Sequence, residues 1–129
     1  MIPLEELNVY KIALGIGDIV WAIVDKWPPF AKQTLGGQSV RSADSIAFNI
    51  AEGHGRYFYK ENRNFCFYSR GSAKELNTAL YRSKKRSLIT EEENGLLQEK
   101  FLSYLKLINA YIKSIGSSKD NEDQANTDH

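Results

Sequence analysis

The chain has 129 residues and a formal net charge of +1, and 42% of its residues are apolar or aromatic. This length suits one compact domain, and the apolar content excludes a chain that is disordered throughout. Cys66 is the only cysteine, which excludes an internal disulfide framework and a thiolate metal cluster and fits a reducing cytoplasm.

The N-terminal part of the chain shows no pattern of a targeting or membrane segment. Residues 1–6 lack the basic and apolar regions of a signal peptide. The longest apolar run, residues 12–24, is short and contains Asp18, so it predicts a buried helix rather than a membrane span. We therefore expect a cytoplasmic protein with no membrane contact.

The first predicted helix runs from about Asn8, a favourable N-cap, to Trp27, where two prolines end it. Its apolar residues form two stripes about 140° apart on a helical wheel. One stripe contains Val9, Ile12, Ile16, Ile19 and Ile23, and the other contains Tyr10, Leu14, Trp21 and Val24. One seam of a helical bundle needs a narrower face, so we expect this helix to bury surface against another subunit.

The second predicted helix, residues 38–53, has an apolar arc of mostly small side chains and ends at Gly53, which suits a left-handed C-cap. Beside that arc, a sector of about 80° carries only polar side chains. These are Ser42, Ser45, Asn49 and Glu52.

Three interpretations of this polar sector can be compared. A catalytic site needs a nucleophile with a base, or two carboxylates in acid and base roles, and no histidine or second acid stands at a spacing that forces such a pair. No set of metal ligands converges there either. The Gly53-His54-Gly55 run is a poor phosphate loop because it follows a helix C-terminus, whose dipole repels anions. We expect no catalytic residue, metal or cofactor.

The structural interpretation is a polar lock between the second and third helices. Small side chains let the two helices approach, so that Asn49 and Glu52 hydrogen-bond across the seam, and a partly buried Glu52 then needs a donor. Ser69, Ser72, a nearby arginine or backbone amides are the candidate donors. We assign Ser45, Asn49, Glu52, Ser72 and Glu75 to this lock.

Two further helices complete the expected domain. The third, residues 60–88, has one narrow core face that contains Phe65, Ser69, Ser72, Leu76, Ala79, Leu80 and Ser83. The fourth begins at a Thr90–Glu93 capping box, ends at Gly116 and has a heptad seam of Leu97, Phe101, Tyr104, Ile108, Tyr111 and Ile115. Short connections favour an all-α, up-down-up-down antiparallel four-helix bundle over residues 1–115. Residues 116–129 are polar and acidic, and we expect them to form a disordered tail.

Several short motifs resemble a known family. They are Gln38, Arg41, Ser45-Ile46, Asn49-Ile50-Ala51-Glu52-Gly53 and Gly55-Arg56, followed by Gly71-Ser72 and Glu75-Leu76. Over about residues 7–115 the chain resembles the four-helix-bundle proteins encoded in intervening sequences of bacterial large-subunit (23S) ribosomal RNA genes. A relative is the accessory variability protein of diversity-generating retroelements, a homopentamer that binds nucleic acid and a reverse transcriptase. The resemblance implies a four-helix bundle, a homopentamer and a nucleic-acid role, and it implies no reaction.

The third helix also has an unusual outer face. Between Arg56 and Arg86 the chain has nine Lys or Arg residues and two Glu residues, with aromatic residues among them. Aromatic rings stack on bases and cations pair with phosphates, so this face suits RNA or DNA. The candidate contacts are Arg56, Arg63, Phe67, Arg70, Lys74, Tyr81, Arg82, Lys84, Lys85 and Arg86. In the alternative interpretation, the aromatic residues pack against another subunit and the cations are solvated.

Three hypotheses of function follow. The leading one is a non-enzymatic, oligomeric protein that associates with nucleic acid. The alternative is a scaffold that assembles around a protein partner, such as a reverse transcriptase, without touching nucleic acid. An enzyme is the third. Salt-dependent binding to RNA separates the first two hypotheses.

Overall fold

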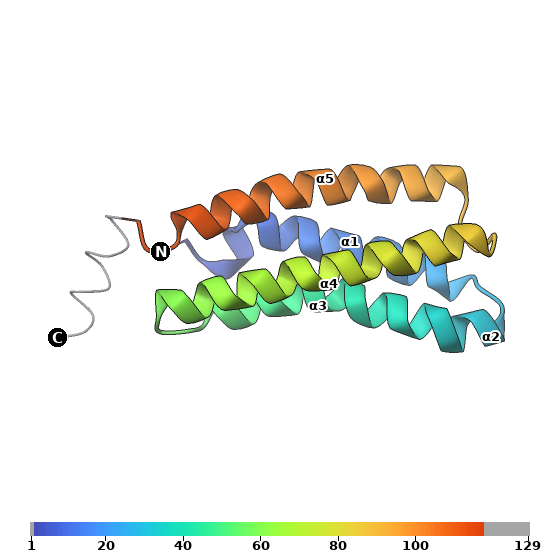
Figure 1. The fold of residues 1–129 in the computed structure, drawn as a ribbon, viewed down its shortest axis with the longest axis horizontal. Coiled ribbons are helices and arrows are strands. Elements are labelled where there is room, and N and C mark those ends of the chain that lie inside the picture. The colour runs from blue at the N-terminus through green and yellow to red at the C-terminus, as the bar shows by residue number, and fades with distance from the viewer. Residues whose placement is uncertain (1, 118–129) are drawn as a thin grey trace.

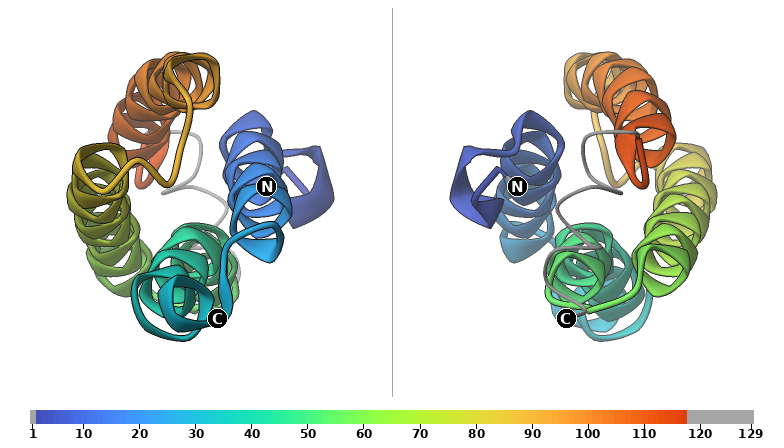
Figure 2. Two further views of the ribbon diagram at one scale, coloured as in Figure 1. Left: turned by 90° about the vertical axis from the view of Figure 1, so that its right-hand side faces the viewer. Right: turned by 90° about the vertical axis from the view of Figure 1, so that its left-hand side faces the viewer.

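The computed structural model describes residues 2–117, and this part of the chain contains four long helices and no strand. The long helices are α1 (Asn8–Asp25), α3 (Gly37–His54), α4 (Tyr59–Lys85) and α5 (Glu91–Ser114). Figure 1 shows them side by side, with their connections at alternate ends of the bundle. Viewed along the bundle, α3 lies between α1 and α4, and α5 completes the ring against both of them (Figure 2). The expected all-α four-helix bundle is confirmed.

The helix boundaries differ from the expected ones by a few residues. A short 3₁₀ turn, η1 (Leu4–Glu6), precedes α1, and Leu7 takes the N-cap position that we expected for Asn8. After Pro28 the chain becomes helical again at once, because the short α2 (Pro29–Ala31) and the π-helical turn η2 (Lys32–Gly36) run directly into α3. Pro29 suits a first helical position since its missing N–H has no partner to lose there.

The start of α5 is fixed by the predicted capping box. The Thr90 hydroxyl accepts a hydrogen bond from the Glu93 N–H at 3.0 Å, and the Thr90 N–H donates to Glu93 Oε1 at 2.9 Å. The bond from the Thr90 N–H lowers the pKa of Glu93, and Lys26 Nζ at 3.3 Å lowers it further. The capping box therefore also ties the end of α1 to the start of α5.

Gly53 lies inside α3, so its predicted role as a left-handed C-cap is wrong. The helix continues to His54, and Gly55 is the cap, with an ordinary φ of −79°. A Cβ atom at Gly53 would lie 2.8 Å from Asn62 Oδ1 and 2.8 Å from Phe65 Cβ. Glycine is needed because α3 and α4 approach each other closely beside their connection.

The core contains the seam expected for α5, except the partly buried Tyr111, and most of the apolar arc expected for α3. Of the two stripes expected for α1, only Val9, Ile16, Ile23 and Val24 are buried. On α4 the buried line is Asn62, Cys66, Ser69, Ala73, Leu76, Ala79, Leu80 and Ser83. Phe65 and Ser72, which we expected in that line, are only partly buried. Alanine and serine on both α3 and α4 explain why these two helices pack more extensively than any other pair.

Part of the second apolar stripe of α1 faces outward. Trp21 is 63% exposed and Leu14 is 41% exposed, whereas Val24 of the same stripe is buried and Tyr10 is partly buried. An exposed tryptophan on a helix face is costly to leave in water. The single chain therefore leaves uncovered a part of the surface that we expected to contact another subunit.

Two other expectations concern a membrane span and the C-terminal tail. Within residues 2–117, no helix combines the length and the hydropathy that crossing a membrane requires. Of the predicted acidic tail, only Gly116 and Ser117 are described, and residues 118–129 lie outside the described part of the chain.

Candidate functional site

The outer face of α4 forms one wall of a groove whose other wall is α5. Five of the predicted contacts are exposed on this face together with Thr78, and they are Phe67, Arg70, Lys74, Tyr81 and Lys85. Two adjoining hollows of about 540 Å³ and about 510 Å³ share Asn77 and make up the groove. We call them the amide pocket and the apolar depression, and together the α4–α5 groove.

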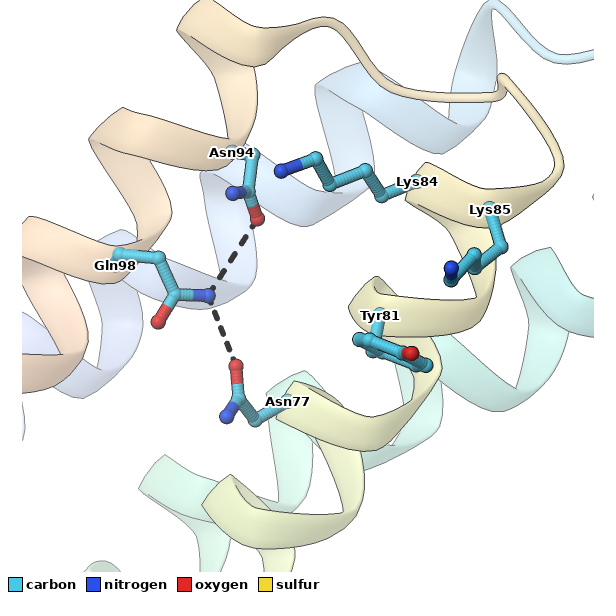
Figure 3. A pocket seen from close by; sticks show the side chains of 6 residues that line it. All are labelled: Asn77, Tyr81, Lys84, Lys85, Asn94 and Gln98. Atoms are coloured by element: carbon cyan, nitrogen blue, oxygen red, sulfur yellow. Dashed lines mark hydrogen bonds between the residues drawn. The ribbon is translucent and has the colours of Figure 1, made fainter.

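The amide pocket lies near the C-terminal end of α4. It is lined by Asn77, Tyr81, Lys84, Lys85, Asn94 and Gln98. Figure 3 shows Lys84 and Asn77 of α4 extending toward Asn94 and Gln98 of α5, with Tyr81 and Lys85 beside them along α4. Gln98 Nε2 donates to Asn77 Oδ1 at 2.9 Å and more weakly to Asn94 Oδ1 at 3.5 Å. Side-chain amides, rather than apolar contacts, therefore join the two helices here.

Two lysines line this pocket, and one of them lies over its exposed ring. Lys85 Nζ lies 5.6 Å from the centre of the Tyr81 ring, within the range of a cation–π contact. Lys84 Nζ forms an ion pair at 3.3 Å with Glu91, and both side chains are exposed. Such an exposed pair contributes little stability and is easily exchanged for another anion.

The apolar depression continues the groove toward the middle of α4. Phe67 lies beneath the Arg70 guanidinium, whose carbon is 4.9 Å from the ring centre. Arg70 also donates to Asn109 Oδ1 of α5 at 2.9 Å. Apolar side chains of α5, Phe101 and Leu105, line the same hollow. Arg70 is thus held in place by both helices, whereas the nearby Lys74 forms no ion pair in the described part of the chain.

Two of the predicted cations lie on the opposite side of α4. Arg82 and Arg86 line a different hollow, next to α2 and α3, together with Arg41 and the exposed ring of Phe30. Glu75, which we had assigned to the polar lock, also lines this hollow. The structure therefore divides the predicted basic face into two surfaces that flank α4.

The remaining two predicted cations lie near the α3–α4 connection and interact with protein groups. Arg56 forms an ion pair with Glu52 at 2.7 Å and lies 4.8 Å from the centre of the Phe65 ring. Arg63 Nη1 donates to the carbonyl of Ile115 at 3.2 Å. Both residues lie away from the α4–α5 groove and do not line it.

The predicted polar lock does not form as expected. Glu52 and Glu75 are exposed, and Ser45, Asn49 and Ser72 are partly buried. Asn49 Nδ2 donates to the carbonyl of Ser45, one turn earlier in the same helix, at 2.9 Å. Within residues 2–117, no hydrogen bond joins any two of these five side chains. The expected cross-helix bonds fail because these side chains lie at the outer edge of the α3–α4 contact, where water and their own helix compete for them.

Ser69 makes the polar connection between helices. Its buried hydroxyl donates to the carbonyl of Ile46 on α3 at 2.8 Å and lies 2.6 Å from the hydroxyl of Tyr104 on α5. The sequence placed Ser69 in the core face of this helix and offered it as a donor to Glu52, but nothing in the spacing of Tyr104 indicated a polar contact. Burial raises the pKa of Tyr104 to about 12, and burial raises the pKa of the nearby Cys66 thiol to about 11.

The α5 wall of the groove was missed in the sequence. Its polar members, Asn94, Gln98 and Asn109, lie beside the heptad seam at helical spacing, and this spacing is the one signal available. No Asp or Glu is among the residues that line the groove. No group of three or more His, Cys, Asp or Glu residues that could hold a metal occurs within residues 2–117. The groove offers cations, amides and rings, a combination suited to binding an anion or a planar ligand.

Comparison with known families agrees with this fold. The family model of the 23S rRNA-intervening sequence protein matches residues 5–110. The chain belongs to the 23S rRNA-intervening sequence protein family. The family model spans α1, α3, α4 and most of α5, so it covers both walls of the α4–α5 groove. A search of the curated proteins finds no match for this member of the 23S rRNA-intervening sequence protein family.

Proposed function

We propose that this protein is a non-enzymatic, oligomeric, cytoplasmic protein that binds RNA or DNA through the α4–α5 groove. One observation carries the proposal: the groove combines the cations Arg70, Lys74 and Lys85 with the exposed rings of Phe67 and Tyr81, and no acidic side chain lines it. Phosphates pair with such cations, and bases stack on such rings. Membership of a family encoded in intervening sequences of ribosomal RNA supports an association with nucleic acid.

Self-association supports the proposal in a second way. The outward-facing Trp21 and Leu14 on α1 give a surface for contact with other copies. We propose a homopentamer, as the family resemblance implies. Several copies of the α4–α5 groove in one assembly strengthen binding, since each groove alone offers only a few phosphate contacts.

A protein scaffold is the second candidate function. The observation that favours it is the apolar floor of the depression, where Phe101 and Leu105 of α5 meet Phe67 of α4. An apolar floor beneath an arginine is also typical of protein interfaces. In this case the occupant is a partner such as a reverse transcriptase, and the groove contacts no nucleic acid.

Titration of a fluorescently labelled RNA with the intact oligomer tests the proposal. At low ionic strength the anisotropy of the RNA should rise with protein concentration, and the affinity should fall steeply as salt is added. A folded oligomer that leaves the anisotropy unchanged at low ionic strength would favour the scaffold.

A further inference from the structure

We propose that the amide pocket captures one unpaired base of a single-stranded nucleic acid. This inference rests on the proposed function and extends it, because it assigns base contacts, and not only phosphate contacts, to the α4–α5 groove.

Tyr81 provides the stacking surface. Its side chain is 63% exposed, and within residues 2–117 no other aromatic ring lies against it. Lys85 Nζ lies over one face of the Tyr81 ring. A base can stack on the other face, since cation–π contact and base stacking each use a face of the ring. An exposed ring inside a hollow, rather than on a convex surface, can hold a base on one side while the hollow walls contact its edge.

The amides of the pocket have unused hydrogen-bonding groups. The two hydrogen bonds among these side chains use Gln98 Nε2 and the oxygens of Asn77 and Asn94. In the described part of the chain this leaves Gln98 Oε1 as a free acceptor and both asparagine Nδ2 groups as free donors. A base edge presents a donor beside an acceptor, and Asn and Gln side chains are the usual partners for such an edge.

The lysines place the phosphate. Lys84 and Lys85 line the same hollow as the amides, so a nucleotide with its base against Tyr81 has its phosphate near these two ammonium groups. Lys84 is held by Glu91 only through an exposed ion pair, which a phosphate can replace. The pocket therefore offers a contact to each part of a nucleotide.

Only an unpaired base fits this arrangement. In a duplex the pairing edge of each base is occupied and both faces are stacked, so neither the amides nor Tyr81 can reach them. The pocket therefore favours single-stranded over double-stranded nucleic acid, whereas binding by phosphate contacts alone favours the duplex, whose charge density is higher.

The test compares three probes of equal length: a single-stranded DNA, the same strand with every base removed, and a blunt-ended duplex of that strand with its complement. The abasic strand keeps every phosphate and loses every base. The intact single strand should bind about tenfold more tightly than the abasic strand, which is the effect of one stacked base. The duplex should bind less tightly than the intact single strand, although its charge density is higher.

Variants then locate the base contact. Tyr81→Ala should abolish most of the difference between the intact and abasic strands, and Gln98→Ala should reduce it severalfold. Tyr68→Ala is the matched control, because Tyr68 lies on the same helix, is 57% exposed and lies outside the α4–α5 groove. It should leave the difference unchanged. Circular dichroism should show that all three variants remain helical.

The outcomes separate this inference from the proposed function. Equal binding of the intact and abasic strands by the wild-type protein would overturn base capture while leaving phosphate-driven binding in place. An unchanged preference in Tyr81→Ala would also overturn it. Failure to bind any of the three probes would contradict the proposed function itself.

Discussion

The hydroxyl of Tyr104 lies 2.6 Å from the hydroxyl of Ser69, in the buried interior where α3, α4 and α5 meet. Ser69 has one proton to donate, and it donates that proton to the carbonyl of Ile46 at 2.8 Å. Tyr104 is therefore the donor in its bond to Ser69. This chain of two hydrogen bonds links three helices through a single serine.

Replacing Ser69 by Ala should destabilise the protein by about 1–3 kcal/mol, because the buried Tyr104 hydroxyl loses its acceptor. Asn49→Ala is the comparison, since Asn49 bonds to a carbonyl of its own helix and is only partly buried. It should cost less than about 1 kcal/mol. Urea unfolding gives the free energy of unfolding of both variants. If Ser69→Ala lowers it no more than Asn49→Ala does, the two buried hydrogen bonds of Ser69 contribute little to stability.

The pH dependence of stability should reveal the buried tyrosine. Burial raises the pKa of Tyr104 from 10.0 to about 12, so between these values the folded state holds a proton that the unfolded state has lost. The contribution of Tyr104 is thus fully present below pH 10 and is lost as the pH rises toward 12. Between pH 10 and about 12, the free energy of unfolding in urea should fall less for Tyr104→Phe than for the wild type. Parallel curves for the two proteins would contradict the burial of this hydroxyl.

Two glycines should respond in opposite ways to alanine. At Gly53 a Cβ would lie 3.0 Å from the backbone oxygen of Asn62, so Gly53→Ala should push α3 from α4 and destabilise the protein by about 1–3 kcal/mol. At Gly71 no atom lies within 4 Å of the added Cβ, so Gly71→Ala should stabilise it by about 0.5–1 kcal/mol through helix propensity. Thermal unfolding measures the stability of both variants. A stabilised Gly53→Ala variant would exclude the close approach of α3 and α4 at this residue.

Self-association should depend on the outer face of α1. The wild-type protein should run as an oligomer in size exclusion with light scattering, and Trp21→Asp should shift it toward the monomer because a carboxylate cannot be buried there without a partner. Phe58→Asp is the control, since Phe58 is also exposed but lies at the α3–α4 connection. A wild-type protein that is monomeric at micromolar concentration would contradict self-association.

Hydrophobic periodicity predicted the helices well where the pattern was long and uninterrupted. The seam of α5 and its Thr90–Glu93 capping box both follow from local spacing, which is why they were predicted correctly. The second long helix was predicted to begin at about residue 38, and α3 begins at Gly37. The two prolines mark the end of α1, but they do not show that residues 29–36 form helical turns that run directly into α3.

Only the α4 side of the candidate site could be predicted from the sequence. The helical spacing of Tyr81 and Lys85 on α4 showed that both face outward. It did not show that Gln98 of α5 lines the same pocket, since that depends on how the two helices pack. The polar lock failed for a related reason. A helical wheel shows that Asn49 is polar and near the seam, but not whether it bonds to a neighbouring helix or to its own Ser45 carbonyl.

Phosphate binding along the α4–α5 groove can be tested with two charge-matched variants. The measurement is the salt dependence of their affinity for RNA. Lys74, Lys84 and Lys85 line the groove. Lys60, Lys106 and Lys113 are exposed elsewhere and do not line it. Changing either set to Glu alters the net charge equally, so any difference between the variants reports position rather than total charge.

Reversal of the groove lysines should weaken RNA binding and lower the slope of log affinity against log salt by about 2, as expected for the loss of about three phosphate contacts with a single strand. The variant at Lys60, Lys106 and Lys113 should keep the wild-type slope. Equal slopes for the two variants would contradict binding in the α4–α5 groove.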